Sequence, residues 1–342
     1  MGMPEHPAEV LDQIATLLER SRASTYKVQA FRRAADTVRE RSFEELAAIN
    51  DANSLRNLPG LGDSTTRVVQ QVLSGETPDY LKRAEADEAP DSGAGAPIRA
   101  ALKGDLHTHS EWSDGGATIE KMARAGAALG HDYMALTDHS GSLSIANGLD
   151  PDRLREQLGV VKRLNEELAP FRLLTGMEVD ILEDGSLDME DDLLAQLDVV
   201  VASVHSKLRM SRQPMTDRMV AAVANPHSDI LGHCTGRMVL GKGRPESEFD
   251  HEVVFAACER FDTAVEINCR PERLDPPMRL LELVLERGCK VSIDSDAHAP
   301  GQLEWQPYGC ARAAEAGVPM DRIVNTWPAD ELLSWTASHA AA

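Results

Sequence analysis

Long apolar runs, basic residues and paired cysteines are all scarce in this sequence. The longest apolar runs have only the length of a strand, so we expect no membrane-spanning helix. The five cysteines lie in the second half of the chain and none has a CxxC spacing, which is typical of reduced thiols in a cytoplasmic protein. No apolar run follows a basic start, so no signal peptide is expected.

Negative charge dominates the composition. The 35 Lys and Arg residues face 56 Asp and Glu residues, and the formal net charge is −21. This excess argues against a bulk electrostatic hold on nucleic acid or on an anionic membrane, although bound divalent cations would offset part of it. An apolar content of 42% is ample for a core, and 342 residues suffice for one large and one small domain.

Residues 1–86 are predicted to form a small all-helical domain. Apolar side chains recur there at helical spacing, as in Val10, Leu11, Ile14, Leu17 and Leu18. Gly60 and Gly62 stand directly before another helical pattern, which is typical of a helix-hairpin-helix. Such glycines let backbone amides at a helix start approach a phosphate oxygen, so both are candidate nucleic-acid-binding residues. A tight turn between packed helices is the alternative.

The composition of residues 87–98 predicts a linker, and residues 99–342 are predicted to form an α/β domain. Strands are predicted near 102–106, 132–137, 172–178, 198–204, 229–232, 263–268 and 290–294. Helical patterns lie between them, for example at 118–129, 152–168 and 276–287. This alternation implies parallel strands with right-handed crossovers. Because polar residues follow nearly every strand, a closed barrel of seven βα units is favoured over an open sheet with one switch point.

Histidines and carboxylates follow six of the seven predicted strands. The nine candidate metal ligands are His107, His109, Asp114, His139, Glu178, His205, His233, Asp296 and His298. A lone histidine after a strand is more often hydrogen bonded or exposed than bound to metal, but chance explains nine such positions poorly. The remaining histidines lack this placement and are interpreted as surface or core residues: His6, His131, His227, His251 and His339.

Strand geometry sharpens this prediction. On a strand, Asp105, His107 and His109 would point to one face, and so would Asp294, Asp296 and His298 if the extended backbone continues. Asp105, Asp138 and Asp294 are candidates for hydrogen bonds to the ligand histidines.

Nine ligands are too many for one ion and suit three divalent ions, since catalytic sites keep open positions. Mixed imidazole and carboxylate ligation fits Zn, Mn or Fe, and spacing does not choose among them. Closely spaced divalent ions stabilise charge on phosphorus and supply hydroxide near neutral pH. The predicted chemistry is therefore hydrolysis of a phosphate ester.

Four motifs resemble the PHP (polymerase and histidinol phosphatase) family over about residues 100 to 330. They are His107-Thr-His109, Thr-Asp-His139, Ser-Val-His205 and Ser-Asp296-Ala-His298. The resemblance implies a distorted (βα)7 barrel with a trinuclear metal site at the strand ends. It also implies three ligand sets: His107, His109, Glu178 and Asp296 for one ion, Glu178, His205 and His233 for the second, and Asp114, His139 and His298 for the third.

Further segments resemble the PHP domain attached to bacterial family X DNA polymerases, among them 145–149, 225–230, 232–237 and 266–270. Residues 1–86 resemble the N-terminal helix-hairpin-helix domain of those polymerases, which can hold gapped DNA. The short linker leaves no room for a polymerase core, so polymerase activity is not expected. The helix after Gly62 carries Thr65, Thr66 and Arg67 where lyase-competent relatives place an amine, so no Schiff-base lyase role is expected.

Cationic and amide side chains near the predicted strand ends are candidates for holding substrate. They are Lys207, Arg209, Arg212, Arg237, Arg270 and Arg273, whose charged groups match phosphate oxygens. Surface ion pairing in an acidic protein is the alternative. Asn268 ends the one predicted strand that supplies no ligand, and it is expected to position substrate or water.

Three functions are consistent with these patterns. The leading hypothesis is a metal-dependent phosphoesterase acting on DNA or nucleotides, for example by 3′–5′ exonuclease action or 3′-end trimming. The first alternative is a phosphatase for small phosphomonoesters such as histidinol phosphate or a nucleotide bisphosphate. The second is a DNA-binding adaptor with a structural metal site, although open multinuclear sites are poor scaffolding.

Overall fold

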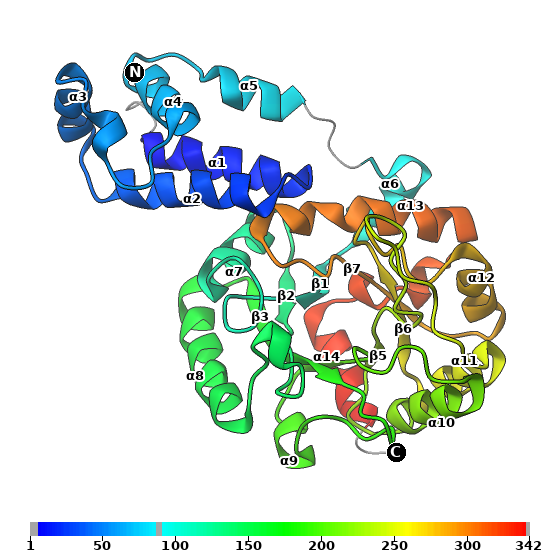
Figure 1. Cartoon of the computed structure of the whole chain (residues 1–342). Helices are drawn as coiled ribbons and strands as arrows, with labels where there is room; N and C mark the ends of the chain where they lie inside the picture. Colours follow the sequence, from blue (N-terminus) through cyan, green and yellow to red (C-terminus); the bar gives the residue numbers. More distant parts are fainter. Residues whose placement is uncertain (1–5, 87–90, 340–342) are drawn as a thin grey trace. The chain divides into compact units, whose positions relative to one another are not determined.

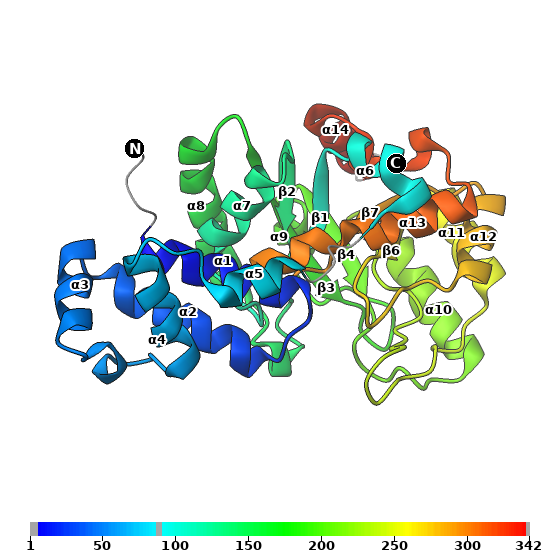
Figure 2. The same ribbon diagram turned by 90° about the horizontal axis from the view of Figure 1, so that it is seen from above.

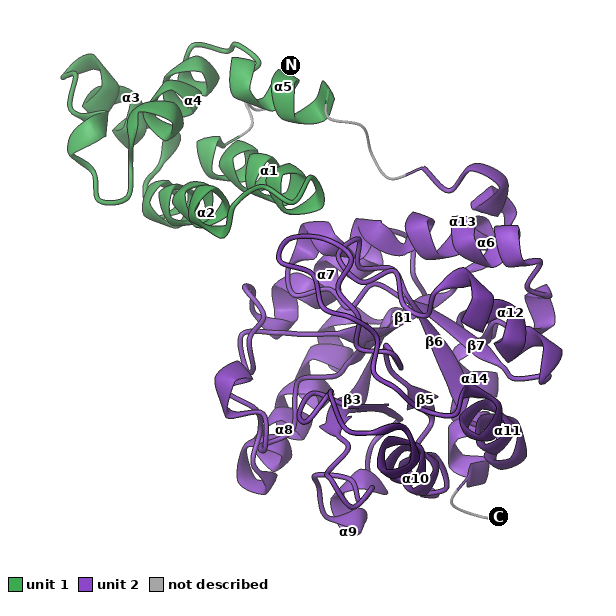
Figure 3. Ribbon diagram, turned by 45° about the vertical axis from the view of Figure 1, so that its right-hand side comes forward, with its two compact units in different colours: residues 1–89 green, residues 90–342 purple. Residues whose placement is uncertain are grey.

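The computed structural model describes residues 6–86 and 91–339, and the chain divides into two compact units (Figure 3). Unit 1 comprises residues 1–89 and unit 2 comprises residues 90–342. Each unit has its own apolar core. Across the described residues, no helix is both long enough and apolar enough to cross a membrane.

Unit 1 is helical, as predicted. Its helices are α1 (Pro7–Arg20), α2 (Thr25–Arg39), α3 (Phe43–Asp51), α4 (Asp63–Leu73) and α5 (Asp79–Ala86), with a 3-10 turn η1 (Leu55–Asn57). Ser42 starts α3 with a capping box, because its side chain accepts from the Glu45 amide while the Glu45 carboxylate accepts from the Ser42 amide. The apolar faces of α1, α2 and α4 meet in one core that includes Leu11, Phe31 and Val69.

Unit 2 contains seven parallel strands that pair in sequence order (Figures 1 and 2). They are β1 (Gly104–Thr108), β2 (Tyr133–Leu136), β3 (Arg172–Asp180), β4 (Val199–Ser203), β5 (Ile230–Leu231), β6 (Ala264–Asn268) and β7 (Val291–Asp294). All seven predicted strands are therefore confirmed, with small differences at their ends. Most strand residues are buried, as expected where helices cover one face and a barrel interior the other.

Helices separate the strands of unit 2, as predicted, and one more helix precedes β1. They are α6 (Ala96–Ala101), α7 (Ile119–Ala128), α8 (Pro151–Leu168), α9 (Asp191–Leu194), α10 (Arg212–Val223), α11 (His251–Phe261), α12 (Met278–Glu286), α13 (Gln306–Ala316) and α14 (Ala329–His339). Shorter 3-10 turns are η2 (Gly93–Gly95), η3 (Ser144–Ala146), η4 (Pro300–Trp305), η5 (Met320–Arg322) and η6 (Val324–Thr326).

The first and last strands meet, so the sheet forms a nearly closed barrel. Thr108 and Ala297 form a parallel bridge, and the His109 amide donates to the Ala297 carbonyl at 2.8 Å. The Leu106 amide donates to Oδ1 of Asp294, also at 2.8 Å. The predicted (βα)7 barrel is confirmed.

One end of the barrel is filled by apolar side chains. Leu332 and Trp335 of α14 share a core cluster with residues at the N-terminal ends of β4, β5 and β6. The polar residues that follow the strands therefore collect at the opposite, C-terminal end, where chemistry occurs in barrels of parallel strands.

The segment predicted to be a linker is only partly described, because residues 87–90 lie outside the described residues. The described part, from residue 91 onward, belongs to unit 2, where it contains η2 and begins α6. Gly95 packs so closely on α13 that a Cβ there would lie 2.3 Å from the Cys310 carbonyl carbon. Only glycine fits this contact.

Candidate metal centre

All nine predicted metal ligands lie at or beyond the C-terminal ends of β1, β2, β3, β4, β5 and β7. His107 and Glu178 belong to strands, whereas the other seven follow them in loops. Most are buried, and the carboxylate of Asp114 is the most accessible of the set, at 38% exposure. The structure thus brings together side chains that span residues 107 to 298.

Glu178 occupies the middle of the cluster and is fully buried. Five imidazole nitrogens surround its two oxygens at 2.8 to 3.5 Å, and they belong to His107, His109, His139, His205 and His233. Such a position, facing both sides of the cluster, suits a carboxylate shared between ions.

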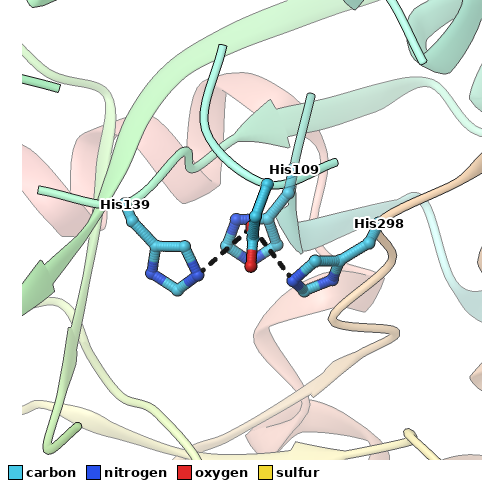
Figure 4. A group of neighbouring side chains, drawn as sticks. His109, His139 and His298 are labelled. Atoms are coloured by element: carbon cyan, nitrogen blue, oxygen red, sulfur yellow. Dashed lines mark ion pairs between the residues drawn. The ribbon is translucent and has the colours of Figure 1, made fainter. Parts of the chain in front are cut away.

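A second carboxylate joins the histidines on one side of the cluster. Asp114 Oδ1 lies 3.5 Å from His139 Nε2 and 3.3 Å from His298 Nε2. Figure 4 shows His109, His139 and His298 gathered around these ion pairs. The rings of His109 and His298 are 4.2 Å apart.

Asp296 approaches the cluster from the β7 side, with Oδ1 3.6 Å from His109 Nε2. Its backbone is left-handed, at φ 52°, and β7 already ends at Asp294. The assumption that the extended backbone continues from Asp294 to His298 is therefore wrong. A turn, and not period-two alternation, carries Asp296 and His298 into the site.

The donor set fits divalent metal ions. Three groups of residues each offer donor atoms that all lie within 4.8 Å of one another. The groups are His109, Asp114, His139 and His298; His107, His109 and Glu178; and His139, Glu178 and His205. Among the described residues, several buried imidazole nitrogens lack a hydrogen-bond partner: Nε2 of His107 and His205, both nitrogens of His109, and Nδ1 of His139 and His233. Unpaired buried nitrogens are costly unless a cation uses their lone pairs.

Family comparisons agree with this geometry. Residues 105–266 match the family model of the PHP domain. The chain carries a PHP domain. Residues 4–78 match the family model of a helix-hairpin-helix domain, which covers most of unit 1.

Two curated relatives align with about two thirds of the chain. The "DNA polymerase/3'-5' exonuclease PolX" of Bacillus subtilis is 39% identical over 224 residues, which are 66% of this chain but only 39% of that protein. A probable phosphatase of a Thermoanaerobacter species is 29% identical over 234 residues, 65% of this chain and 89% of the relative. Among solved structures, histidinol phosphate phosphatase from Lactococcus lactis with zinc, L-histidinol and phosphate is 18% identical, with a TM-score of 0.48, over 63% of this chain and 94% of that one.

Electrostatics within the PHP domain favour a charged carboxylate among the imidazoles. Burial alone would raise the pKa of Glu178, but the surrounding histidines outweigh it and hold this pKa well below its usual range. Burial and then the charge of Arg273 lower the pKa of His233 to about 3, so this imidazole is neutral, as a metal ligand must be. Burial also opposes protonation of His205, but Glu178 and Asp180 outweigh burial and raise its pKa to about 9.

Two carboxylates behind the predicted ligands were missed in the sequence. Glu266 of β6 lies 2.6 Å from His107 Nδ1, and Asp180 of β3 lies 3.1 Å from His205 Nδ1. Both residues could have been found from the two-residue alternation of a strand, which places side chains two positions apart on one face. Glu266 precedes Asn268 by two residues, and Asp180 follows Glu178 by two.

Of the three aspartates predicted to bond the ligand histidines, Asp105 bonds the backbone of one, and the other two have different partners. Asp105 accepts from backbone amides, including that of His107, and Asp138 accepts from Ser110, Ser113 and Gln157. Asp294 accepts from the Leu106 amide and from the Asn325 side chain. They stabilise the loops that carry the ligands, and Glu266 and Asp180 contact the rings.

The candidate substrate-holding residues separate into two groups. Arg270 and Arg273 border the cluster: Arg270 Nη1 lies 3.5 Å from Asp296 Oδ1, and Arg273 Nε lies 3.3 Å from Asp296 Oδ2. Asn268 donates to Asp296 Oδ2 at 3.1 Å, so it contacts a ligand carboxylate.

The other cations have partners elsewhere. Arg237 donates to the backbone carbonyls of Arg273 and Leu274, and therefore supports the loop after β6. Lys207 forms an exposed ion pair with Glu183 at 3.4 Å. Arg212 forms another with Asp250 at 2.9 Å.

The predicted hairpin of unit 1 contains both glycines at the start of α4. Gly60 has a φ of 79°, which glycine adopts at little cost, and Gly62 is the N-terminal cap of α4. The Gly62 amide donates to Oγ1 of Thr65 at 2.9 Å. A Cβ at Gly62 would meet no atom within 4 Å, so this side of the turn is open.

Proposed function

We propose that the PHP domain hydrolyses phosphate esters with divalent metal ions held by the nine converging residues. The main support is the arrangement of five imidazoles around Glu178, with buried nitrogens that lack a hydrogen-bond partner among the described residues. We assign three ions to the site, Zn, Mn or Fe, because imidazole and carboxylate donors suit these metals. Elemental analysis of the purified protein tests the number and identity of the ions.

Bound divalent ions would lower the pKa of a water molecule and stabilise negative charge on the phosphoryl group. Arg270 and Arg273 lie beside Asp296, where their guanidinium groups can hold phosphate oxygens next to that centre. Asn268 holds Asp296 through its side-chain amide. We therefore assign the anion-holding role to Arg270 and Arg273, with Arg237 supporting their loop and Lys207 at the exposed rim.

We favour DNA or nucleotide 3′ ends as the substrate. Two observations support this choice: the helix-hairpin-helix match in unit 1, and a relative named as a 3'-5' exonuclease that is 39% identical over 224 residues. Gly62, at the start of α4, has open space where a side chain would lie, as contact with a phosphate requires. The test is manganese-dependent release of nucleotides from the 3′ end of a labelled DNA strand.

An Asp296→Asn variant provides the matched control for that assay. It keeps the size of the side chain but removes a charged ligand, so release should fall by at least about 100-fold while the circular dichroism spectrum stays unchanged. Release that is equal in the two proteins would exclude the assigned site.

A small phosphomonoester is the second candidate substrate. The probable phosphatase aligns with 65% of this chain and over 89% of its own length. Competition separates the two candidates: DNA should inhibit cleavage of p-nitrophenyl phosphate if both use one site. Cleavage unaffected by excess DNA favours the small substrate. DNA binding that survives chelation, without hydrolysis of any ester, would favour the adaptor.

A further inference from the structure

We propose that Glu266 is a positioning residue for the metal centre. It fixes the tautomer of His107, holds the backbone at His233 and, through Asn268, holds the side chain of Asp296. This inference rests on the proposed metal-dependent function but adds a residue outside the nine candidate ligands. Glu266 lies in β6, the one strand that supplies none of them. Its role is to hold three ligands in metal-binding geometry.

The first contact concerns the ring of His107. Glu266 Oε1 lies 2.6 Å from His107 Nδ1, and both side chains are fully buried. A carboxylate can only accept, so Nδ1 carries the hydrogen and the lone pair remains on Nε2. That Nε2 points to Glu178, at 3.2 Å, and has no hydrogen-bond partner among the described residues. The contact therefore selects the tautomer that can bind a metal ion through Nε2.

The second contact concerns the backbone of His233. Glu266 Oε2 accepts from the His233 amide at 2.6 Å. His233 has a positive φ of 20°, a conformation that non-glycine residues rarely adopt and that persists only where neighbouring groups enforce it. The same residue places Nε2 2.8 Å from Glu178. The hydrogen bond from Glu266 thus holds a strained loop residue whose ring faces the site.

The third contact reaches Asp296 through an amide. Asn268 Nδ2 donates to Glu266 Oε2 at 3.2 Å and to Asp296 Oδ2 at 3.1 Å. Asp296 also has a left-handed backbone, at φ 52°. Both ligands with positive φ, His233 and Asp296, are therefore anchored to the same carboxylate, one directly and one through Asn268.

The burial of the Glu266 carboxylate argues against a purely structural role for this residue. Its neighbours in β6 are Ala264, Val265 and Ile267, and an apolar side chain at position 266 would satisfy a barrel interior. A buried carboxylate costs free energy unless hydrogen bonds compensate for lost hydration. The three hydrogen bonds described above all lead to metal ligands.

The test compares metal affinity in Glu266→Gln and in a matched control, Asp229→Asn. Asp229 is also a buried carboxylate that accepts from a histidine ring, His339 Nδ1 at 2.8 Å, and from a backbone amide, Val200 at 2.8 Å. It precedes β5, at the opposite end of the barrel. The metal-free full-length proteins are titrated with Mn²⁺ and Zn²⁺ by calorimetry, and the melting temperature of each is measured.

Glu266→Gln should raise the Kd for metal by about 10- to 100-fold, because the amide offers one acceptor oxygen where the carboxylate offers two. Saturating metal should then restore phosphate-ester hydrolysis to within a few-fold of the unsubstituted protein, which a merely structural defect would not allow. Asp229→Asn should keep the unsubstituted Kd even where its melting temperature falls. Asn268→Ala removes the link from Glu266 to Asp296, together with the hydrogen bond that Asn268 Oδ1 accepts from the Arg270 amide at 3.1 Å, and should weaken metal binding by a smaller factor.

Unchanged metal affinity in both Glu266→Gln and Asn268→Ala would overturn the inference, as would an equal loss of affinity in Asp229→Asn. If Glu266→Gln does not fold, Asn268→Ala decides the question by itself. These measurements need no substrate, so they separate the two proposals. A protein that binds metal through Glu266-dependent ligands but cleaves no phosphate ester would refute the proposed function and leave this inference intact.

Discussion

The carboxylate of Glu178 lies 3.0 Å from Nδ1 of His139, and the same imidazole extends through Nε2 to Asp114 at 3.5 Å. One histidine therefore faces two carboxylates that come from different loops and strands. Glu178 in turn contacts four further histidines. The donor groups share residues, so loss of a central ligand should affect more than one ion.

Glu178→Gln should consequently remove bound metal from more than one position. The amide is the same size but lacks the charge that balances the cations among five imidazoles. We expect a loss of at least about 100-fold in metal-dependent hydrolysis, beyond the range seen for residues that only support ligands. Metal content by elemental analysis, at equal protein concentration, checks this. A variant that retains all its metal would contradict the central position of Glu178.

Arg273→Ala should mainly change KM, whereas Arg237→Ala should mainly change stability. Arg273 borders Asp296, so its loss should raise KM for a phosphate ester by about tenfold or more. Arg237 donates to backbone carbonyls, so its loss should lower the free energy of unfolding by about 3 kcal/mol and affect KM less. Steady-state kinetics and chemical denaturation distinguish the two variants. A stability loss in Arg273→Ala with a raised KM in Arg237→Ala would contradict both assignments.

His131 should make the folded protein sensitive to acid. Burial, assisted by the charge of Arg99, lowers its pKa to about 4, against 6.5 for an ordinary histidine. Between these values the unfolded chain binds a proton that the folded chain does not, so stability falls as pH drops from 6.5 to 4. The loss should approach about 1.4 kcal/mol per pH unit. Denaturation midpoints of His131→Gln should fall less steeply over this window than those of the unsubstituted protein.

The two hairpin glycines of unit 1 should respond differently to alanine. Gly60 has a φ of 79°, so Gly60→Ala should cost about 1 to 2 kcal/mol of stability. Gly62 has a φ of −102° and open space beside it, so Gly62→Ala should fold normally. A methyl group there should nevertheless obstruct a phosphate and weaken DNA binding by about tenfold. Filter binding measures this, with cleavage of p-nitrophenyl phosphate as the unaffected control. Equal DNA affinity would leave the hairpin a structural turn.

The sequence predicted the barrel well because each strand is a short apolar run with a helical pattern after it. The ligand candidates were equally accessible, since histidines and carboxylates directly after such runs are unusual, and the structure brings all nine together. The supporting residues were harder to find. Glu266 lies within a strand interpreted as supplying no ligand, and its partner His107 is 159 residues away.

What the sequence determined by itself was the order of strands and helices and the end of the barrel where polar groups gather, because local periodicity and residue type decide both. Only the tertiary structure decided how those groups divide their tasks. Asp296 reaches the cluster through a left-handed turn that strand alternation does not anticipate, and Arg237 donates to backbone carbonyls of the loop after β6. Such assignments depend on which neighbour from a distant strand lies within hydrogen-bonding distance, and that distance is set only when the barrel closes.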